Sequence, residues 1–279
     1  MIHELDSLQF RNEYINNIPD EKSRIICMSG ASLLVRTDTE EIVFPSARDM
    51  YLTGKSPVYL FSVGEIKYFY SADEKLKDKS LFGYLSVSKQ LRYMSPKHEV
   101  FAAFTAYHLI NWYLNNRFCG RCGSSTVHSQ AQRMLYCPQC KNEIYPKISP
   151  AVIVAVTNGD KLLMTRYADR DYNRQALVAG FTEIGETSEQ TAAREVMEET
   201  GLKIKNIRYY KNQPWGMTGT LLTGFFAQLD SDDKITLDTS ELSEAGWYSR
   251  EEINAVNEDF SLTNEMIWAF KNAAEFTNK

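Results

Sequence analysis

Residues 180–202 decide the fold of this chain, and they read Gly180-Phe-Thr-Glu-Ile-Gly-Glu-Thr-Ser-Glu-Gln-Thr-Ala-Ala-Arg-Glu-Val-Met-Glu-Glu-Thr-Gly-Leu202. Residues 188–200 predict a helix, and Gly201 suits its C-cap. On that helix Glu195, Glu198 and Glu199 are spaced i, i+3 and i+4, so they share one face and repel one another. Arg194 is one positive partner for them, but we expect it to point off that face. Divalent magnesium or manganese, which prefer hard oxygen ligands, would neutralise the three carboxylates.

The composition excludes several classes of protein. A net charge of −5 argues against a protein devoted to nucleic-acid binding, since such proteins are usually basic. A hydrophobic content of 43% is too high for a disordered chain. Residues 1–6 lack the pattern of a signal peptide, and no apolar run approaches the roughly 18 residues of a membrane helix. We therefore expect a cytoplasmic protein with no membrane association, in which paired cysteines bind metal.

The residue composition and the hydrophobic pattern change along the chain, and these changes predict four parts. Residues 1–95 are strand-rich, with strands over 24–35 and 57–70, the second interrupted by a turn at Gly64-Glu65. Residues 96–117 form a connecting helix, opened by Pro96, and residues 118–147 a compact cysteine-rich insert. Residues 148–279 mix strands and helices as an α+β domain. The predicted apolar stripe of the connecting helix comprises Phe101, Phe104, Tyr107, Ile110 and Leu114.

Within the last part, residues 151–156 predict a strand and residues 161–167 its hairpin partner across a turn at 158–160. A further strand is expected over 221–229. Helices are expected over 249–256 and 264–276.

Two Cys-x-x-Cys pairs lie fifteen residues apart, and their members are Cys119, Cys122, Cys137 and Cys140. Thiolates at this spacing bind one tetrahedral zinc ion, and Gly120, Gly123 and Pro138 supply the tight backbone turns. Redox chemistry at one pair is the alternative, but four cysteines fit a closed structural site with no open position. Cys27 is interpreted as a buried apolar residue.

Residues 180–202 resemble the Nudix box, G-x5-E-x7-R-E-U-x-E-E-x-G-U with U aliphatic, at every defined position. Three glutamates alone would be better interpreted as a solvated helix face, but here they come with glycines, Glu186 and Arg194 at fixed offsets. The resemblance implies a Nudix α/β/α sandwich from about residue 148 onwards. It implies that Glu195 and Glu199 bind two or three catalytic metal ions, with Glu198 as a further ligand or helper and the carbonyl of Ala179 completing the shell. It also implies that Gly180, Glu186, Arg194 and Gly201 are structural, with Arg194 pairing with Glu186.

The cysteine pairs just upstream of this box resemble the zinc ribbon of the NADH pyrophosphatase family. The segments around Leu91-Arg92, Arg117-Phe118 and 145–150 resemble the same family. Downstream, that family carries S-Q-P-W-P-F-P-x-S. This chain keeps Gln213-Pro214-Trp215 but continues Gly216-Met217-Thr218-Gly219-Thr220.

The resemblance implies that residues 213–220 bind substrate, with Trp215 stacking on a base, although core packing is the alternative for Trp215 taken alone. It implies that Tyr145 and Phe181 line the nucleotide pocket, and that Arg92 contacts phosphate or is simply a surface arginine. It further implies that Glu244, in Glu241-Leu-Ser-Glu244-Ala-Gly-Trp-Tyr, is a metal ligand. Glu241 is its competitor, and a surface carboxylate is the simpler alternative.

The resemblance therefore predicts metal-dependent hydrolysis of the pyrophosphate of NAD(H) to AMP and nicotinamide mononucleotide by a homodimer, with NAD-capped RNA as a second substrate. A broader dinucleotide or nucleoside-diphosphate hydrolase is an alternative, favoured by the altered Pro-Phe-Pro segment. A Nudix-fold nucleotide sensor without activity is another, and such proteins usually have eroded boxes. A ribbon that binds nucleic acid is the least favoured, since Arg121, Arg133 and Lys141 are its few basic loop residues.

Overall fold

The computed structural model describes residues 1–52, 57–72, 75–168, 175–256 and 258–272. The chain divides into two compact units. Unit 1 comprises Met1, Ile148–Pro214 and Thr220–Lys279, and unit 2 comprises Ile2–Lys147 and Trp215–Gly219. The tip of one hairpin thus belongs to a different unit from its two strands.

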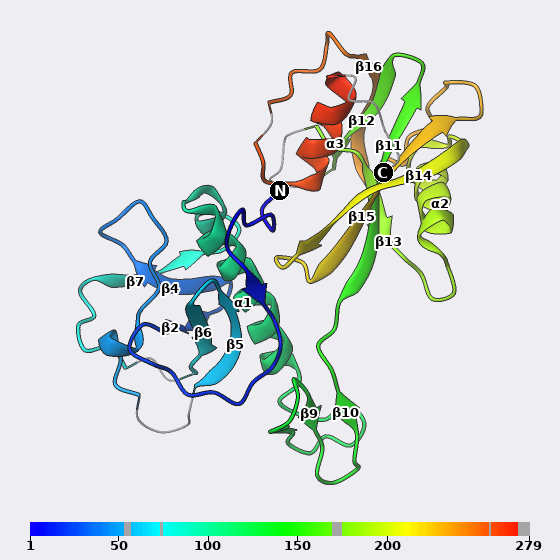
Figure 1. The fold of residues 1–279 in the computed structure, drawn as a ribbon. Coiled ribbons are helices and arrows are strands. Elements are labelled where there is room, and N and C mark those ends of the chain that lie inside the picture. The colour runs from blue at the N-terminus through cyan, green and yellow to red at the C-terminus, as the bar shows by residue number, and fades with distance from the viewer. Residues whose placement is uncertain (53–56, 73–74, 169–174, 257, 273–279) are drawn as a thin grey trace. The chain divides into compact units, whose positions relative to one another are not determined.

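The helices and strands follow one another along the chain as drawn in Figure 1. In unit 2 they are β1 (Phe10–Arg11), β2 (Arg24–Ile26), β3 (Met28–Ser29), β4 (Ser32–Arg36), η1 (Ala47–Asp49), β5 (Val58–Val63), β6 (Ile66–Tyr70), β7 (Phe82–Ser86), η2 (Leu91–Tyr93), α1 (Lys97–Asn115), β8 (Val127–His128), β9 (Leu135–Tyr136) and β10 (Glu143–Ile144). In unit 1 they are β11 (Ser149–Asn158), β12 (Lys161–Tyr167), β13 (Val178–Phe181), α2 (Ser188–Thr200), β14 (Ile204–Trp215), β15 (Thr220–Leu229), β16 (Leu242–Ser249) and α3 (Leu262–Lys271).

Unit 1 is an α/β/α sandwich built around β11. The sheet order is β14-β15-β11-β12-β16, and β13 pairs with β11 off this path. Alternate residues of β11 point to opposite faces. Ile153 and Ala155 pack in a core cluster with residues of α3, whereas Val152, Val154 and Val156 pack in a second cluster with Ala192 and Val196 of α2. The two helices accordingly cover opposite faces of the sheet in Figure 1, and the predicted sandwich is confirmed.

Several predicted elements of unit 1 are confirmed because local signals define them. β11 and β12 form the predicted antiparallel hairpin across Gly159, which has a positive φ of 60°. α2 begins with a capping box between Thr187 and Gln190 and ends at Gly201, whose φ is 71°. That left-handed geometry is easily adopted only by glycine.

Other predictions for unit 1 were wrong. Residues 250–252 form a turn and residues 253–256 have no regular secondary structure, where a helix was predicted. Ile253 is buried, and its backbone N–H bonds to the carbonyl of Ser249. β14 and β16 were not predicted. α3 begins at Leu262, two residues before the expected start, and residues 273–276 of the predicted helix lie outside the described residues.

Among its described residues, unit 2 has two small sheets in its N-terminal part and a third in the cysteine-rich insert. Their strand orders are β1-β5-β6-β2, β3-β4-β7 and β10-β9-β8. The hairpin β5–β6 turns at Gly64 as predicted, and the predicted strand over 24–35 is divided into β2, β3 and β4. Pro96 is the N-cap of α1, one position before the first turn.

The single apolar stripe predicted for α1 is too narrow. Phe101, Phe104 and Ile110 are buried as expected, but Leu114 is exposed. Residues outside the stripe are also buried, among them Val100, Ala102, Ala103, Ala106, Leu109, Trp112 and Tyr113. A helix that is apolar on most sides is a core helix. In the part of the chain that the structure describes, no helix is both long and apolar enough to cross a membrane.

Candidate functional site

Gly180 lies where the backbone of β13 meets the carboxylate of Glu195. A Cβ atom added to Gly180 would lie 2.0 Å from Cδ of Glu195 and 2.2 and 2.3 Å from its two oxygens. Such distances leave no room for a side chain. Ala179, the preceding residue of β13, pairs with Ile153 of β11, so the central sheet fixes the backbone beside Glu195.

Arg194 is the centre of the charge network in the box. Its Nε and Nη2 donate to the two oxygens of Glu186 at 2.7 and 2.9 Å, which is the expected pair. Its Nη1 donates to Glu195 at 2.8 Å and to Glu198 at 2.9 Å. The prediction that Arg194 points off the acidic face was therefore wrong, because the fork of five donors lets one guanidinium serve several carboxylates.

Glu186 holds the loop before α2 in place. Its carboxylate accepts the backbone N–H of Glu183 at 3.1 Å and the hydroxyl of Thr191 at 3.0 Å. The hydrogen bonds from Arg194 are the main reason that the pKa of Glu186 is lowered to about 2. Thr191 is fully buried and was missed by the sequence analysis, since a threonine in a helix has no distinguishing pattern.

The three box glutamates differ sharply in burial. Glu199 is 2% exposed and Glu195 9% exposed, whereas the side chain of Glu198 is 57% exposed. Burial raises the pKa of Glu195, with hydrogen bonds from Arg194 opposing the shift and the charges of Glu198 and Glu241 adding to it. Buried carboxylates retain their charge where cations compensate them, and their oxygens suit hard divalent ions. The donors of this site therefore fit magnesium or manganese.

The carboxylates are not gathered at a single point. Among the described residues, the cysteines of the insert are the one group of three or more potential ligands whose atoms all lie within 4.8 Å of one another. Arg194 holds Glu195 and Glu198 in this conformation.

Glu241 and Glu244 lie in different surroundings. Glu244 of β16 lies 3.4 Å from Nε of Arg166 and accepts a hydrogen bond from Tyr248 at 3.1 Å on the surface. Glu241 immediately precedes β16, and its charge acts on Glu195. The expected role of Glu244 therefore has a competitor that is electrostatically coupled to the box.

Gln213 is buried and bonded within unit 1. It is 1% exposed, its Nε2 donates to the carbonyl of Phe260 at 2.9 Å, and its Oε1 accepts the N–H of Leu262 at 2.8 Å. The nitrogen and the oxygen of the side-chain amide thus each bond to a backbone group near the start of α3. These two hydrogen bonds tie β14 to the start of α3 within unit 1.

The residues after Gln213 divide between the two units. Pro214 is exposed at the end of β14, and Thr220 is buried and pairs with Ser149 in β11. Trp215, Gly216, Met217, Thr218 and Gly219 form a turn that belongs to unit 2. The ring of Trp215 packs edge to face on Phe104 of α1, with centroids 5.3 Å apart.

The remaining predicted pocket residues are exposed or paired within their own units. Tyr145 of unit 2 is 51% exposed, and its hydroxyl donates to Glu143 at 3.2 Å. Phe181 of unit 1 is 56% exposed, and its carbonyl accepts from Arg194 at 3.0 Å. Arg92 of unit 2 lies over the ring of Tyr93 at 5.1 Å.

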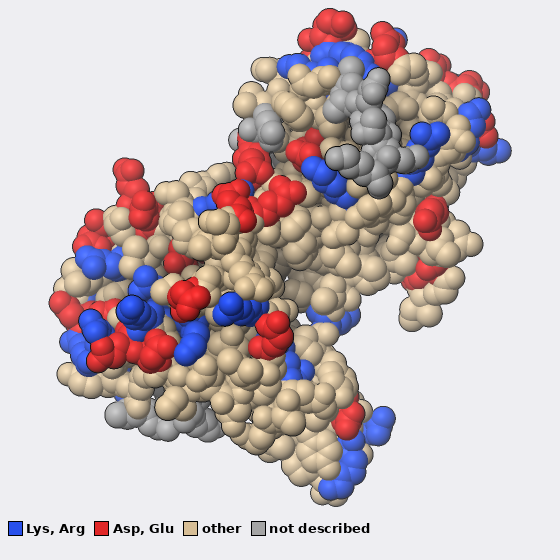
Figure 2. All heavy atoms as spheres, viewed as in Figure 1, with Lys and Arg blue, Asp and Glu red and all other residues tan. Residues whose placement is uncertain are grey.

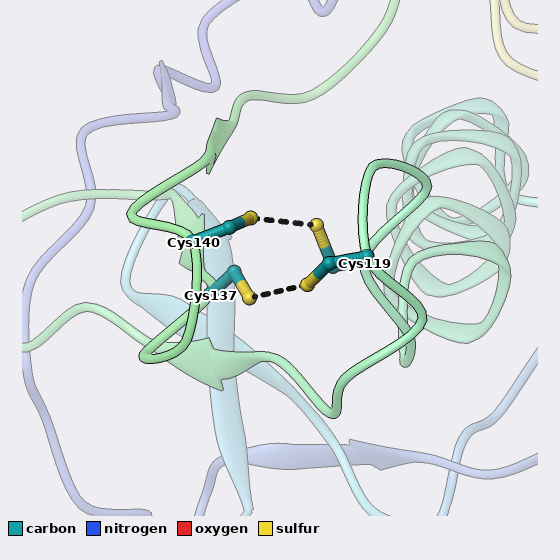
Figure 3. Close-up of side chains that lie close together, drawn as sticks. Cys119, Cys137 and Cys140 are labelled. Atoms are coloured by element: carbon teal, nitrogen blue, oxygen red, sulfur yellow. Dashed lines mark hydrogen bonds between the residues drawn. The ribbon is translucent and has the colours of Figure 1, made fainter.

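The ligand atoms of the four cysteines of the insert all lie within 4.8 Å of one another, and Figure 3 labels three of the residues, Cys119, Cys137 and Cys140. Sγ of Cys119 lies 3.5 Å from that of Cys140, and Sγ of Cys122 lies 3.5 Å from that of Cys137. Ligands of a tetrahedral zinc ion at Zn–S distances of about 2.3 Å lie about 3.8 Å apart, so the thiols fit one zinc ion. The backbone N–H of Ser124 is the main reason that the pKa of Cys122 is lowered to about 6, which favours the thiolate that zinc requires.

The two knuckles repeat the same backbone geometry. The N–H of Cys119 bonds to the carbonyl of Ser124, and that of Cys137 bonds to the carbonyl of Asn142. Gly123 and Lys141 donate back to the carbonyls of Cys119 and Cys137 in the same way. Both have a positive φ, of 76° and 60° respectively.

Comparison with known proteins agrees with this architecture. Residues 147–266 match the NUDIX domain, and residues 114–145 match the NADH pyrophosphatase zinc ribbon domain. This chain carries a Nudix domain. The Nudix domain begins directly after the cysteine-rich insert, which is a zinc ribbon, and the resemblance found in the sequence is confirmed. The four cysteines are thereby assigned to structural zinc.

Relatives of this chain include proteins named NAD-capped RNA hydrolase NudC. The one from Enterobacter sp. (strain 638) is 42% identical over 145 residues, and the one from Shigella flexneri is 41% identical over 145 residues. Each alignment covers 52% of this chain and 56% of the relative, so the chain spans about half the length of the curated relatives it matches. A crystal structure of a NUDIX hydrolase from Nitrosomonas europaea is 23% identical, with a TM-score of 0.49, and covers 57% of this chain and 92% of that one.

Proposed function

We propose that this protein hydrolyses the pyrophosphate bond of NAD(H) and releases AMP and nicotinamide mononucleotide. The observation that carries the proposal is the pair of buried carboxylates, Glu195 and Glu199, on a Nudix helix beside the backbone of Gly180. The adjoining ribbon of the NADH pyrophosphatase type supports a dinucleotide as the substrate. The name of the NudC relatives, which concerns NAD-capped RNA, points to the same pyrophosphate linkage.

Glu195 and Glu199 would hold the catalytic magnesium or manganese ions, with Glu198 and the carbonyl of Ala179 as further ligands. A divalent cation, when bound, neutralises the charge of the diphosphate and makes water more acidic. Arg194 keeps Glu195 and Glu198 oriented and ties them through Glu186 to the loop before α2. The short backbone of Gly180 lets the sheet approach Glu195 closely. These residues thus pre-organise negative charge on a rigid helix, which is the protein's own contribution to catalysis.

A further carboxylate ligand for the metal ions would come from outside the box, and the two candidates are Glu241 and Glu244. Backbone hydrogen bonds tie Glu241 to the end of α2, because the N–H of Asp238 bonds to the carbonyl of Glu199 at 3.0 Å and the N–H of Glu241 bonds to the carbonyl of Asp238 at 3.3 Å, and this supports Glu241. The pairing of Glu244 with Arg166 and Tyr248 supports a structural role for Glu244.

The decisive experiment measures release of AMP from NADH with magnesium or manganese. We expect the unaltered chain to release AMP and Glu199→Gln to lose activity by more than about 100-fold while remaining folded. Glu189→Gln is the matched control, because Glu189 lies on the same helix and is exposed. Binding of NADH without release of AMP by the unaltered chain would instead establish the nucleotide sensor.

NAD-capped RNA is a second proposed substrate, and the name of the relatives is what favours it. Its pyrophosphate linkage is the same, so the box would act on it without change. On the face seen in Figure 2, basic and acidic side chains are interspersed among the described residues of each unit, so the electrostatic attraction for a long RNA is weak there. We therefore expect the cap to be recognised rather than the RNA body. Rates on capped RNA that are insensitive to RNA length and fall little with salt would agree with this.

The alternative function is a hydrolase of dinucleotides or nucleoside diphosphates in general. Values of kcat/KM for a panel of such substrates distinguish it from an enzyme that prefers NAD(H). A homodimer and a cytoplasmic location also remain proposals. The reduced cysteines of the ribbon favour that location, because zinc thiolates persist in a reducing compartment.

A further inference from the structure

The turn formed by Trp215, Gly216, Met217, Thr218 and Gly219 is seated on one face of α1. The seat consists of Phe104 and His108, which are spaced i and i+4 and therefore lie one turn apart on the same side of the helix. The turn and the two helix residues belong to unit 2, as does Lys147, whose carbonyl His108 contacts. The turn is the segment in which this chain departs from Pro-Phe-Pro.

Gly216 makes the closest approach. A Cβ atom at this position would lie 2.2 Å from the carbonyl oxygen and 2.6 Å from the carbonyl carbon of Phe104. The obstructing atoms belong to the helix backbone, which cannot rotate away as the end of a side chain can. A proline or any other residue with a Cβ is therefore excluded from this position while the turn is seated.

His108 supports the other end of the turn. Its Nε2 donates to the carbonyl of Lys147 at 2.9 Å, which fixes the imidazole in one orientation. The backbone of Gly219, with a φ of 69°, packs so closely that a Cβ atom there would lie 2.9 Å from the same Nε2. Phe104 meets Trp215 edge to face, so ring contact and backbone contact arise from neighbouring turns of one helix.

We propose that α1, through Phe104 and His108, is a positioning element for the turn 215–219 and so determines the affinity for the dinucleotide. The stiffness that two prolines would give the turn is supplied instead by the helix on which it lies. The close packing of the turn on α1 therefore requires a glycine at position 216. This inference rests on the proposed function for the ligand and for the part that the turn takes in binding it, whereas the packing of the turn on α1 is independent of that function.

The seat is tested without any substrate by hydrogen–deuterium exchange of residues 212–221. Gly216→Ala and His108→Leu are expected to speed exchange in this segment. His108→Gln should exchange as the unaltered chain does, because its amide nitrogen can donate to Lys147 in place of Nε2. Asn115→Ala, at the exposed end of the same helix, is the control for a general change in α1. Unchanged exchange in both Gly216→Ala and His108→Leu would overturn the seat.

The role in binding is tested by kinetics with NADH in the same variants. For Gly216→Ala and His108→Leu we expect KM to rise about tenfold, equivalent to about 1.4 kcal/mol, with kcat changed less than about threefold. His108→Gln should keep the original KM. Faster exchange with unchanged KM would overturn the positioning role, whereas an unaltered chain inactive on NADH would refute the proposed function and leave the exchange result standing. If Gly216→Ala fails to fold, the His108 pair decides both questions.

Discussion

The closest approach around the box is between a glycine backbone and a carboxylate. Gly180 and Glu195 are linked by a shape constraint, because a methyl group at 180 would occupy the space of the Glu195 carboxyl group. The constraint explains why a glycine precedes the loop of the box. It also gives an interaction that can be measured apart from metal binding.

Gly180→Ala is expected to lower the free energy of unfolding by about 1–3 kcal/mol, the usual cost of overpacking. In a chain that already carries Glu195→Ala the same change should cost much less, because the obstructing carboxyl group is gone. Thermal or denaturant unfolding of the four chains in this double-mutant cycle measures the coupling. Equal costs of Gly180→Ala in the two backgrounds would show that the clash is relieved elsewhere.

Glu241→Gln and Glu244→Gln separate the two candidates for the fourth carboxylate. If Glu241 acts with the box, its variant loses activity on NADH by more than about tenfold and requires more metal for half-maximal rate. Glu244→Gln should then change the rate little, since Glu244 is engaged by Arg166 and Tyr248 on the surface. The reverse ranking would restore Glu244 as the metal ligand.

Individual side chains also show where inference from sequence stops. Spacing alone places Glu195, Glu198 and Glu199 on one face of a helix, and the structure agrees. Spacing does not tell where a long side chain turns, so the contacts of Arg194 with Glu195 and Glu198 could not be foreseen. Gln213 was assigned to substrate from its place in the family motif, and its observed bonding partners, 47 and 49 positions further along the chain, could not be read from the sequence.

Elements were predictable where their ends are encoded locally. α2 begins at a capping box and ends at a glycine, both of which are recognisable in the sequence, and its bounds match the prediction. β14 was missed, because its twelve residues are mostly polar or half-exposed and become a strand by pairing with β15. The knuckles of the ribbon were predicted from cysteine spacing, but their repeated backbone geometry was not.

That repeat predicts the effect of a substitution in the second knuckle. Lys141 adopts the left-handed conformation that Gly123 adopts in the first knuckle, and a residue with a Cβ pays about 1 kcal/mol for it. Lys141→Gly should stabilise the ribbon by up to about 1 kcal/mol, although it loses the contact of Nζ with the ring of Tyr136. Lys141→Ala loses the same contact and keeps the strain, so it is the matched control. Zinc release to a competing chelator ranks the three chains, and a glycine variant that releases zinc more readily than the alanine variant would contradict the argument.

At the scale of the whole molecule, the two compact units differ in where they bury carboxyl groups. Unit 1 buries its carboxylates at the box, whereas unit 2 buries Glu99 in the first turn of α1 at 7% exposure. The hydroxyl of Tyr68 donates to Glu99 at 2.9 Å. Burial raises the pKa of Glu99, with the hydrogen bond from Tyr68 and the charge of Arg24 opposing the shift. Glu99 lies outside the box and the ribbon, so its titration reports on the stability of unit 2.

The sign of the resulting pH dependence follows from proton linkage. Between the ordinary carboxyl pKa near 4.5 and the raised value, folded Glu99 holds a proton that the unfolded chain has released. The free energy of unfolding of unit 2 therefore falls as pH rises through this window and is constant above it. Glu99→Gln keeps a neutral side chain of the same shape at every pH, so relative to it the unaltered chain should lose stability as the pH rises above the ordinary carboxyl value. Denaturant unfolding of both chains over this range, where other titrating groups cancel in the difference, measures the effect. A constant difference would mean that Glu99 is ionised in the folded protein, and a difference that grows in favour of the unaltered chain would reverse the assignment.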